Sequence, residues 1–270
     1  MKRRPNRWIR VVVNLAIVVA LMTALSFLPP DTSLDDRKAA GVLKVCIPPS
    51  YPPLVTGDPA QPGFDVELVT AIAERLGLRP QLNVLSSIGS DFNPRNWSLT
   101  RGQCDMLAGG LADTVQTRSF LQTIPTPVET GWVGVSASGA LPTAGGSVAV
   151  LPGTSGLNRL ELSSWLREKG LVVVPTRSPQ QFADALASGR AEAGITERFV
   201  AAAMSLPASL QLFWLPDERF APQRMALGLW KGDQTLKRAV DNALGEIDSS
   251  GQMDEILGRY RLKLGSTPRY

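Results

Sequence analysis

The residues best suited to gripping a small charged molecule are one arginine and one glutamate. Arg118 follows a predicted strand that ends at Gly109 and Gly110, and its guanidinium can hold a carboxylate through two parallel hydrogen bonds. Glu197 ends a second predicted strand, and its carboxylate suits an ammonium group. The alternative for either residue is a solvated surface charge. The sequence does not separate a ligand-pairing carboxylate from a catalytic one.

An aromatic residue and a turn with two hydroxyls could complete such a site. Tyr51 stands between prolines that stiffen its loop, and its ring either faces a cationic ligand or packs on a proline at the surface. Residues 152–156 (PGTSG) join a strand to a helix. Free backbone N–H groups there, with the hydroxyls of Thr154 and Ser155, either make an anion site or only cap the helix. Asp65 is interpreted as a helix cap and nothing more.

The composition excludes several classes of protein. None of the 270 residues is a histidine, which removes Ser-His-Asp and Cys-His catalysis and argues against a catalytic zinc site. The net charge of +4 comes from five cations within the first ten residues. Without them, 23 basic residues stand against 24 acidic ones. We therefore expect no nucleic-acid partner, no metal and no cofactor.

Residues 1–30 are predicted to be a signal peptide or an N-terminal membrane anchor. After the basic start, 18 residues from Val11 to Leu28 carry no charge. As a helix they would span about 27 Å, just enough to cross a bilayer uncleaved, while Ala24-Leu25-Ser26 offers a cleavage site. The basic end stays in the cytoplasm. We expect a periplasmic or otherwise extracytoplasmic protein, cleaved or anchored to the inner membrane by residues 11–28, with residues 31–40 as a polar linker.

The chain contains two cysteines, Cys46 and Cys104. An even number of cysteines in a chain that enters an oxidising compartment makes a disulfide between them plausible. The alternative is two small buried thiols.

The rest of the chain alternates strands and helices in two successive blocks, followed by two terminal helices. Two such blocks predict an α/β fold with two parallel-sheet lobes, and these sheets bind ligands beyond the carboxyl ends of their strands, here between the lobes. The expected strands are 43–47, 81–85, 105–108, 132–135, 148–151, 171–174 and 193–196, and the expected helices are 65–77, 95–102, 157–170, 178–189, 236–247 and 253–260.

Six segments, in this order, resemble the extracellular solute-binding proteins of family 3, which typically bind polar amino acids for ABC importers. Together they span about residues 41–262. Each motif alone is weak, whereas six in order are specific. The segments are LKVCIPPSYPPL, GFDVELVTAIAERLGL, GQCDMLAGG followed by Arg118, VAVLPGTSG, SGRAEAGITERFVAA and LWKGDQTLKRAVDNALGEIDSSGQMDEILGRY.

The resemblance implies a type II-like periplasmic-binding-protein fold, with two lobes joined by a hinge of two crossing strands. Lobe one would comprise residues 41–136 and 228–265, and lobe two residues 140–222. The implied function is capture of a small polar solute, an amino acid or a related carboxylate, by hinge closure. The partner would be the permease of an ABC importer, and no catalysis would be involved.

The resemblance also assigns roles to residues around Arg118. This arginine matches the one that holds the ligand α-carboxylate, with Gly110 and Thr114 as further ligand-binding residues. The spacing departs from the family, because residues 114–118 (TVQTR) are one residue longer than the usual Thr-x-x-Arg.

Further roles follow from the same resemblance. Thr154 and Ser155 would bind the same carboxylate from lobe two, and Tyr51 would be a wall against which the ligand side chain stacks. Glu197 stands where the family usually has an aspartate that pairs with the ligand α-amino group. Its additional methylene shortens the remaining pocket. The ligand therefore either sits differently or is not an ordinary α-amino acid.

Two other functions stay open on this fold. Some periplasmic dehydratases that act on arogenate or prephenate resemble the same family, and their general acid here would be Glu197, Asp113 or Glu129. The second alternative is a ligand-sensing accessory protein that acts through a separate partner.

Overall fold

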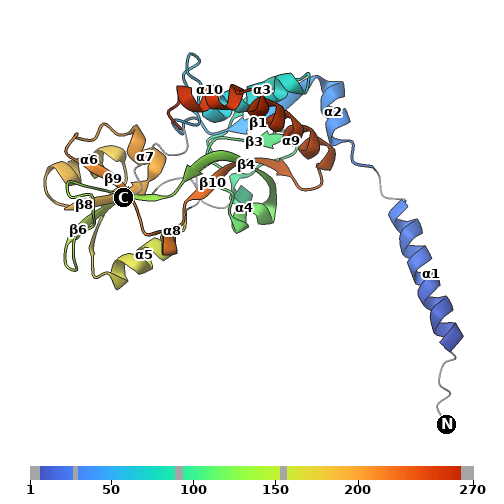
Figure 1. The fold of residues 1–270 in the computed structure, drawn as a ribbon, viewed down its shortest axis with the longest axis horizontal. Coiled ribbons are helices and arrows are strands. Elements are labelled where there is room, and N and C mark those ends of the chain that lie inside the picture. The colour runs from blue at the N-terminus through green and yellow to red at the C-terminus, as the bar shows by residue number, and fades with distance from the viewer. Residues whose placement is uncertain (1–6, 27–29, 89–93, 153–156, 263–270) are drawn as a thin grey trace, which may run out of the picture. The chain divides into compact units, whose positions relative to one another are not determined.

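The computed structural model describes residues 7–26, 30–88, 94–152 and 157–262 (Figure 1). The chain divides into two units, Met1–Thr32 and Ser33–Tyr270. The first unit contains the helix α1 (Arg7–Ser26), which overlaps the apolar N-terminal segment. Within the described ranges, no helix has both the length and the apolar content needed to cross a membrane.

The predicted linker contains a helix, α2 (Ser33–Ala40), which packs beside α9 (Gln234–Ser249). The hydroxyl oxygens of Ser33 and Thr235 lie 2.9 Å apart, and the N–H of Leu34 donates to the same Thr235 oxygen over 3.2 Å. Arg37 forms an ion pair with the buried Asp105. The linker prediction is therefore corrected for this segment, because a polar composition does not reveal hydroxyls and charges that dock on a distant helix.

The first lobe is built on a five-stranded sheet. In order across the sheet, its strands are β2 (Arg79–Val84), β1 (Val42–Ile47), β3 (Met106–Leu107), β10 (Gln223–Trp230) and β4 (Leu121–Thr130). β1 runs parallel to β2 and β3, whereas β10 runs antiparallel to β3 and β4. Three helices, α3 (Phe64–Arg75), α9 and α10 (Gln252–Arg259), share a hydrophobic core with this sheet (Figure 1).

The second lobe repeats this plan. Its strands, again in order across the sheet, are β7 (Val172–Pro175), β6 (Ser147–Val150), β8 (Ala193–Glu197), β5 (Trp132–Ser136) and β9 (Gln211–Trp214). The helices of this lobe are α5 (Arg159–Glu168), α6 (Pro179–Ala187), α7 (Arg198–Ala203) and α8 (Asp217–Phe220). β6 runs parallel to β7 and β8, and β5 runs antiparallel to β8 and β9.

The α/β class is confirmed, but the sheets are mixed rather than parallel. The chain passes from β4 into β5 of the second sheet and returns from β9 into β10 of the first. A strand that arrives from the other lobe enters its sheet from the opposite end, so β5 and β10 run antiparallel to their neighbours. The sheets also place residues 132–136 in the second lobe and residues 223–230 in the first, which shifts both predicted boundaries by a few residues.

Cys46 and Cys104 form a disulfide in the structure, across a sequence separation of 58 residues. Cys46 lies in β1, and Cys104 lies just before β3, which pairs with β1. Both belong to a second core of the first lobe, together with Ile88 and Trp97. Closing a loop of this length stabilises the fold by about 4 kcal/mol in the chain-entropy model. The bond therefore holds together the segment that carries Tyr51.

Candidate functional site

Glu197 and Tyr51 join the two lobes through a buried hydrogen bond. Glu197 ends β8 of the second lobe and is fully buried, and its Oε1 accepts a hydrogen bond from the hydroxyl of Tyr51 of the first lobe. The same Oε1 accepts from the Thr130 hydroxyl over 2.6 Å, at the end of β4. A buried carboxyl group requires such donors. In this structure the hydroxyls of Tyr51 and Thr130 donate to the Glu197 carboxyl group, which was predicted to pair with a ligand ammonium group.

Tyr51 is held in place by its own loop. Its N–H donates to the Val55 carbonyl over 2.6 Å, and its carbonyl accepts the N–H of Val55 over 3.0 Å. The ring is 7 % exposed and meets the ring of Phe199 edge-on, with centroids 6.0 Å apart. Gly110 lies against it with a φ of +104°, and a Cβ there would come within 2.8 Å of the ring. Glycine is therefore required at position 110 for packing as well as for backbone conformation.

A cavity of about 190 Å³ lies beside the Tyr51 ring in the first lobe. It opens at the carboxyl ends of β1 and β3, where α/β sheets bind their ligands. None of its described lining residues carries a charge. The lining residues are Pro48, Pro49, Ser50, Tyr51, Ile88, Trp97, Gly109 and Gly110. The structure thus places the predicted residues Tyr51 and Gly110 around one cavity, and Tyr51 connects them to Glu197 through its hydroxyl.

Asp65 binds the glycine loop beside this cavity and does not cap α3. The N-cap of α3 is Gly63, and Asp65 is 1 % exposed, with its Oδ2 accepting the Gly109 N–H over 2.7 Å. The helix-cap interpretation is therefore wrong, because the carboxyl group points to the glycine loop after β3. Burial raises the pKa of Asp65 to about 7, and the backbone N–H groups of Gly109 and Gly110 oppose this rise.

Arg118 is not brought together with these residues. Thr114 caps α4 (Val115–Phe120) by accepting the Thr117 N–H over 3.0 Å, so the third helical position, which the family motif gives to arginine, is held by the buried Thr117. Arg118 follows about 100° further around the helix. Its side chain is 52 % exposed, and it pairs with Asp113 at 3.1 Å. Among the described residues, no hydrogen bond or ion pair connects it to Tyr51 or Glu197.

The turn that carries Thr154 and Ser155 lies outside the described residues. The helix that follows it, α5, is capped by the Asn158 side chain, which accepts the Glu161 N–H over 3.1 Å. The N-cap of α5 is therefore Asn158, and the roles considered for Thr154 and Ser155 stay predictions.

Arg198 is a residue whose role the sequence did not reveal. It follows Glu197, and its backbone N–H donates to the Gly131 carbonyl over 3.0 Å, while its guanidinium donates to the Glu129 carbonyl over 2.8 Å. The guanidinium also lies 5.8 Å from the centroid of the Trp214 ring. Burial lowers the pKa of this arginine. Arg198 thus ties the start of α7 to the strand crossing between the lobes, and no spacing motif marks such a role.

The chain is tightly packed around Gly131, where it crosses from the first lobe to the second. A Cβ on Gly131, between β4 and β5, would come within 2.7 Å of the Trp214 ring. A side chain at position 131 would therefore require the Trp214 ring to move.

The three carboxyl groups considered as general acids have different surroundings. Asp113 accepts the Thr123 hydroxyl over 2.6 Å and pairs with Arg118. Glu129 lines a separate surface groove with Arg224 and Asp248. Glu197 is fully buried and accepts the hydroxyls of Tyr51 and Thr130.

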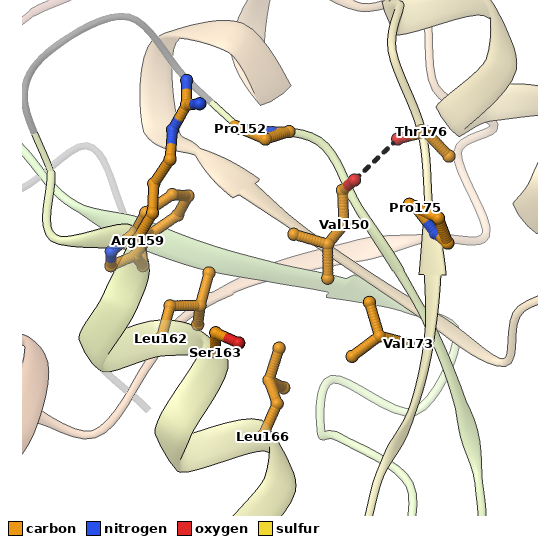
Figure 2. A pocket seen from close by; sticks show the side chains of 10 residues that line it. Val150, Pro152, Arg159, Leu162, Ser163, Leu166, Val173, Pro175 and Thr176 are labelled. Atoms are coloured by element: carbon orange, nitrogen blue, oxygen red, sulfur yellow. Dashed lines mark hydrogen bonds between the residues drawn. The ribbon is translucent and has the colours of Figure 1, made fainter. Parts of the chain in front are cut away.

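A groove in the second lobe lies between α5 and the strands β6 and β7, and we call it the α5 groove (Figure 2). Its volume is about 240 Å³. Arg159, at the first position of α5, extends its guanidinium toward Pro152 at the edge of the groove (Figure 2). Burial lowers the pKa of this guanidinium. No spacing in the sequence indicated this arginine.

A family model described as bacterial extracellular solute-binding proteins, family 3, matches residues 43–263. The match covers both lobes. Among curated proteins, none matches this sequence.

Several solved structures have the same fold. A mutant of ArgBP from T. maritima is 23% identical, with a TM-score of 0.61 over 86% of this chain and 100% of that chain. An ancestral cationic amino acid solute-binding protein is 19% identical, with a TM-score of 0.64 over 86% and 100%. A substrate-binding protein of an ABC uptake transporter from Streptococcus pneumoniae, with bound histidine, is 18% identical, with a TM-score of 0.63 over 85% and 96%. These neighbours confirm the two-lobed type II fold.

The buried Asp65 predicts a stability that falls as the pH rises. Its pKa is about 7 in the folded protein and about 3.8 in the unfolded chain, so its contribution to the free energy of unfolding is present below pH 3.8 and is lost as the pH rises through 7. Between pH 5 and pH 8 the loss amounts to about 3 kcal/mol. Asp65→Asn removes this titrating group, so the free energy of unfolding of the variant should depend less on pH between pH 5 and pH 8.

Urea unfolding at several pH values measures this effect. The exposed Asp58 provides the control, since Asp58→Asn should keep the wild-type profile. A wild-type slope that persists in Asp65→Asn would show that other groups titrate.

Proposed function

We propose a solute-capture function from one established premise: the chain belongs to the bacterial extracellular solute-binding proteins, family 3. The solute is a small polar molecule, most simply an amino acid, and it binds between the two lobes without being transformed. The loaded form delivers it to the permease of an ABC importer.

The observation that carries this proposal is the buried contact of Tyr51 with Glu197. One oxygen of a buried carboxyl group meets hydroxyls from the first lobe and from the crossing strand, beside an uncharged cavity. A ligand ammonium group is a stronger donor than a neutral hydroxyl, so it can replace Tyr51 on this oxygen. Ligand binding and the contact between the lobes are thereby linked, as hinge closure requires.

The solved neighbours support an amino acid as the solute. The protein from Streptococcus pneumoniae was solved with bound histidine, and an ancestral arginine-binding protein was solved with bound arginine. For this chain the solute class is our proposal.

A thermal-shift screen over the common amino acids and small carboxylates tests the function. A ligand at one hundred times its dissociation constant should raise the free energy of unfolding by about 2.7 kcal/mol, because it binds only the folded protein. The control is Glu197→Gln, which keeps the size of the side chain and removes its negative charge. This variant should lose at least tenfold in affinity for an amino acid. Amino-acid capture is wrong if no amino acid shifts the unfolding of the wild type.

The geometry predicts a small role for Arg118 in binding. Arg118→Ala should change ligand affinity less than threefold, because the guanidinium is exposed and pairs with Asp113. Calorimetric titration of the ligand found in the screen measures this, with Glu197→Gln as the variant expected to lose affinity. A loss of tenfold or more in Arg118→Ala would restore this arginine as the carboxylate clamp.

We propose that both lobes lie outside the cytoplasm and that the N-terminal segment directs their export. The basic start and the uncharged residues 11–28 support export. The mature protein should lack about 26 residues, because the apolar segment is near the lower limit for spanning a bilayer. Mass spectrometry of the protein from the native compartment decides this, since an intact mass indicates a membrane anchor.

A further inference from the structure

Asp65 is a buried carboxyl group to which the proposed solute capture gives no role. It stands in the first turn of α3, and its Oδ2 accepts the Gly109 N–H over 2.7 Å. Its own N–H donates to the Leu54 carbonyl over 3.0 Å, in the loop that begins at Tyr51. One residue of α3 therefore bonds to both loops beside the Tyr51 ring. We call the cavity of about 190 Å³ there the Tyr51 cavity.

The glycine loop that Asp65 holds is part of the wall of the Tyr51 cavity. Gly109 and Gly110 both line this cavity, and both have a positive φ, of +86° and +104°. A Cβ on Gly109 would come within 2.5 Å of Pro48, and one on Gly110 within 2.8 Å of the Tyr51 ring. The two glycines are thus packed directly against other lining residues, so a shift of the loop moves the cavity wall.

The carboxyl group of Asp65 holds this loop more strongly when it is ionised. Hydrogen bonds to a carboxylate are shorter and about twice as strong as bonds between neutral groups. Burial raises the pKa of Asp65 to about 7, and the N–H groups of Gly109 and Gly110 oppose this rise. Since these N–H groups favour the ionised form, ionisation in turn favours the loop position that they define.

The elements packed against α3 bring no second buried charge to Asp65. These elements are β1, β2, α9 and α10, and their charged residues are exposed or half-buried. The half-buried ones are Lys44 on β1 and the paired Lys237 and Asp241 on α9. On α3 itself, Glu67 accepts the Tyr260 hydroxyl over 2.6 Å and pairs with Arg259.

The two neighbouring loops carry three further titratable groups. Tyr51 donates its hydroxyl to the buried Glu197, and Asp113, which follows the glycine loop, pairs with Arg118. Asp58 is exposed. None of the 270 residues is a histidine, so no side chain with an ordinary pKa titrates near pH 7. A transition near pH 7 is therefore informative in this protein.

The Tyr51 cavity lies beside the contact at which the solute is proposed to bind, so this inference rests on the proposed solute capture. We propose that Asp65 is a positioning residue of the ligand site: its ionised carboxyl group holds the glycine loop against Tyr51, and ligand binding, which needs this wall in place, releases the Asp65 proton to solvent. A ligand ammonium group favours the same ionised form, because it brings a positive charge beside the loop. Ligand affinity therefore rises as the pH increases through 7.

Amide NMR spectra of the full chain without amino acids, recorded from pH 5.5 to pH 8, test the positioning. The signals of Gly109, Gly110 and the Tyr51 ring should shift together with a midpoint near pH 7. Asp65→Asn, which keeps an acceptor oxygen and cannot ionise, should remove this transition. Glu74→Gln removes an exposed carboxyl group from the same helix and should keep it.

The positioning role is overturned if the Tyr51 ring signals of the wild type do not follow the glycine signals, or if the glycine signals do not shift. It is also overturned if the transition persists in Asp65→Asn. The wild-type spectra alone can overturn it, so the test does not depend on the folding of the variant.

Thermal-shift measurements test the link to ligand binding. The probe is an equimolar mixture of the common amino acids except histidine and cysteine, whose side chains titrate near this range. The stabilisation of the wild type should correspond to an affinity at least threefold higher at pH 8 than at pH 5.5. Asp65→Asn should show a difference of less than twofold, and Glu74→Gln should follow the wild type.

Equal wild-type affinities at the two pH values would overturn the link. So would a pH dependence that persists in Asp65→Asn and disappears in Glu197→Gln, since Glu197 would then be the titrating group. If the mixture stabilises the wild type at neither pH, amino-acid capture is wrong, and the amide spectra still decide whether Asp65 positions the loop.

Discussion

A carboxyl group at the junction of two lobes cannot be buried without donors, and this requirement organises the structure around Glu197. Its Oε1 receives the hydroxyls of Tyr51 and Thr130, which reach it from the first lobe and from the crossing strand. Tyr51 can reach it because its loop is pressed against Gly110, and the adjoining Gly109 is held by the buried Asp65. A chain of contacts thus extends from α3, through the loop after β3, to the second lobe, and it consists of two buried hydrogen bonds joined by the packing of Gly110 on the Tyr51 ring. The ligand that we propose to compete for Glu197 would act on this whole chain of contacts.

The two strand crossings impose a second constraint. β5 and β10 each enter a sheet from the other lobe, which makes both sheets mixed and leaves the hinge short. Packing around Gly131 and the hydrogen bonds of Arg198 to backbone carbonyls make this hinge a defined structure rather than a loose linker. The closure that we propose would therefore be accommodated by small changes in a few backbone angles near the crossing.

The Arg118 segment shows how one residue changes a site. The one additional residue between Thr114 and Arg118 leaves the cap at Thr114 and the strand β4 in place. It moves the arginine from the third to the fourth position of α4. A rotation of about 100° takes the guanidinium from the position of the buried Thr117 to solvent. The cap at Thr114 thus fixes the helical phase, so one additional residue in the motif changes where the arginine lies.

The sequence by itself determined the α/β class and the order of the two blocks, because periodicity, turn residues and composition are local properties, and six matching segments indicated the family. It left open whether the two cysteines are bonded, which the structure decided. It also predicted Tyr51, Gly110 and Glu197 as site residues, since their positions at strand ends follow from that order, and their ligand-binding roles stay predictions. It passed over β4, whose Pro125 and Pro127 argue against a strand and are tolerated only because β4 lies at the sheet edge. Only the tertiary structure decided that both sheets are mixed, that α2 docks on α9, that Asp65 holds a glycine loop and that Arg159 borders a groove. These features depend on contacts between residues far apart in the chain, which local sequence patterns do not encode.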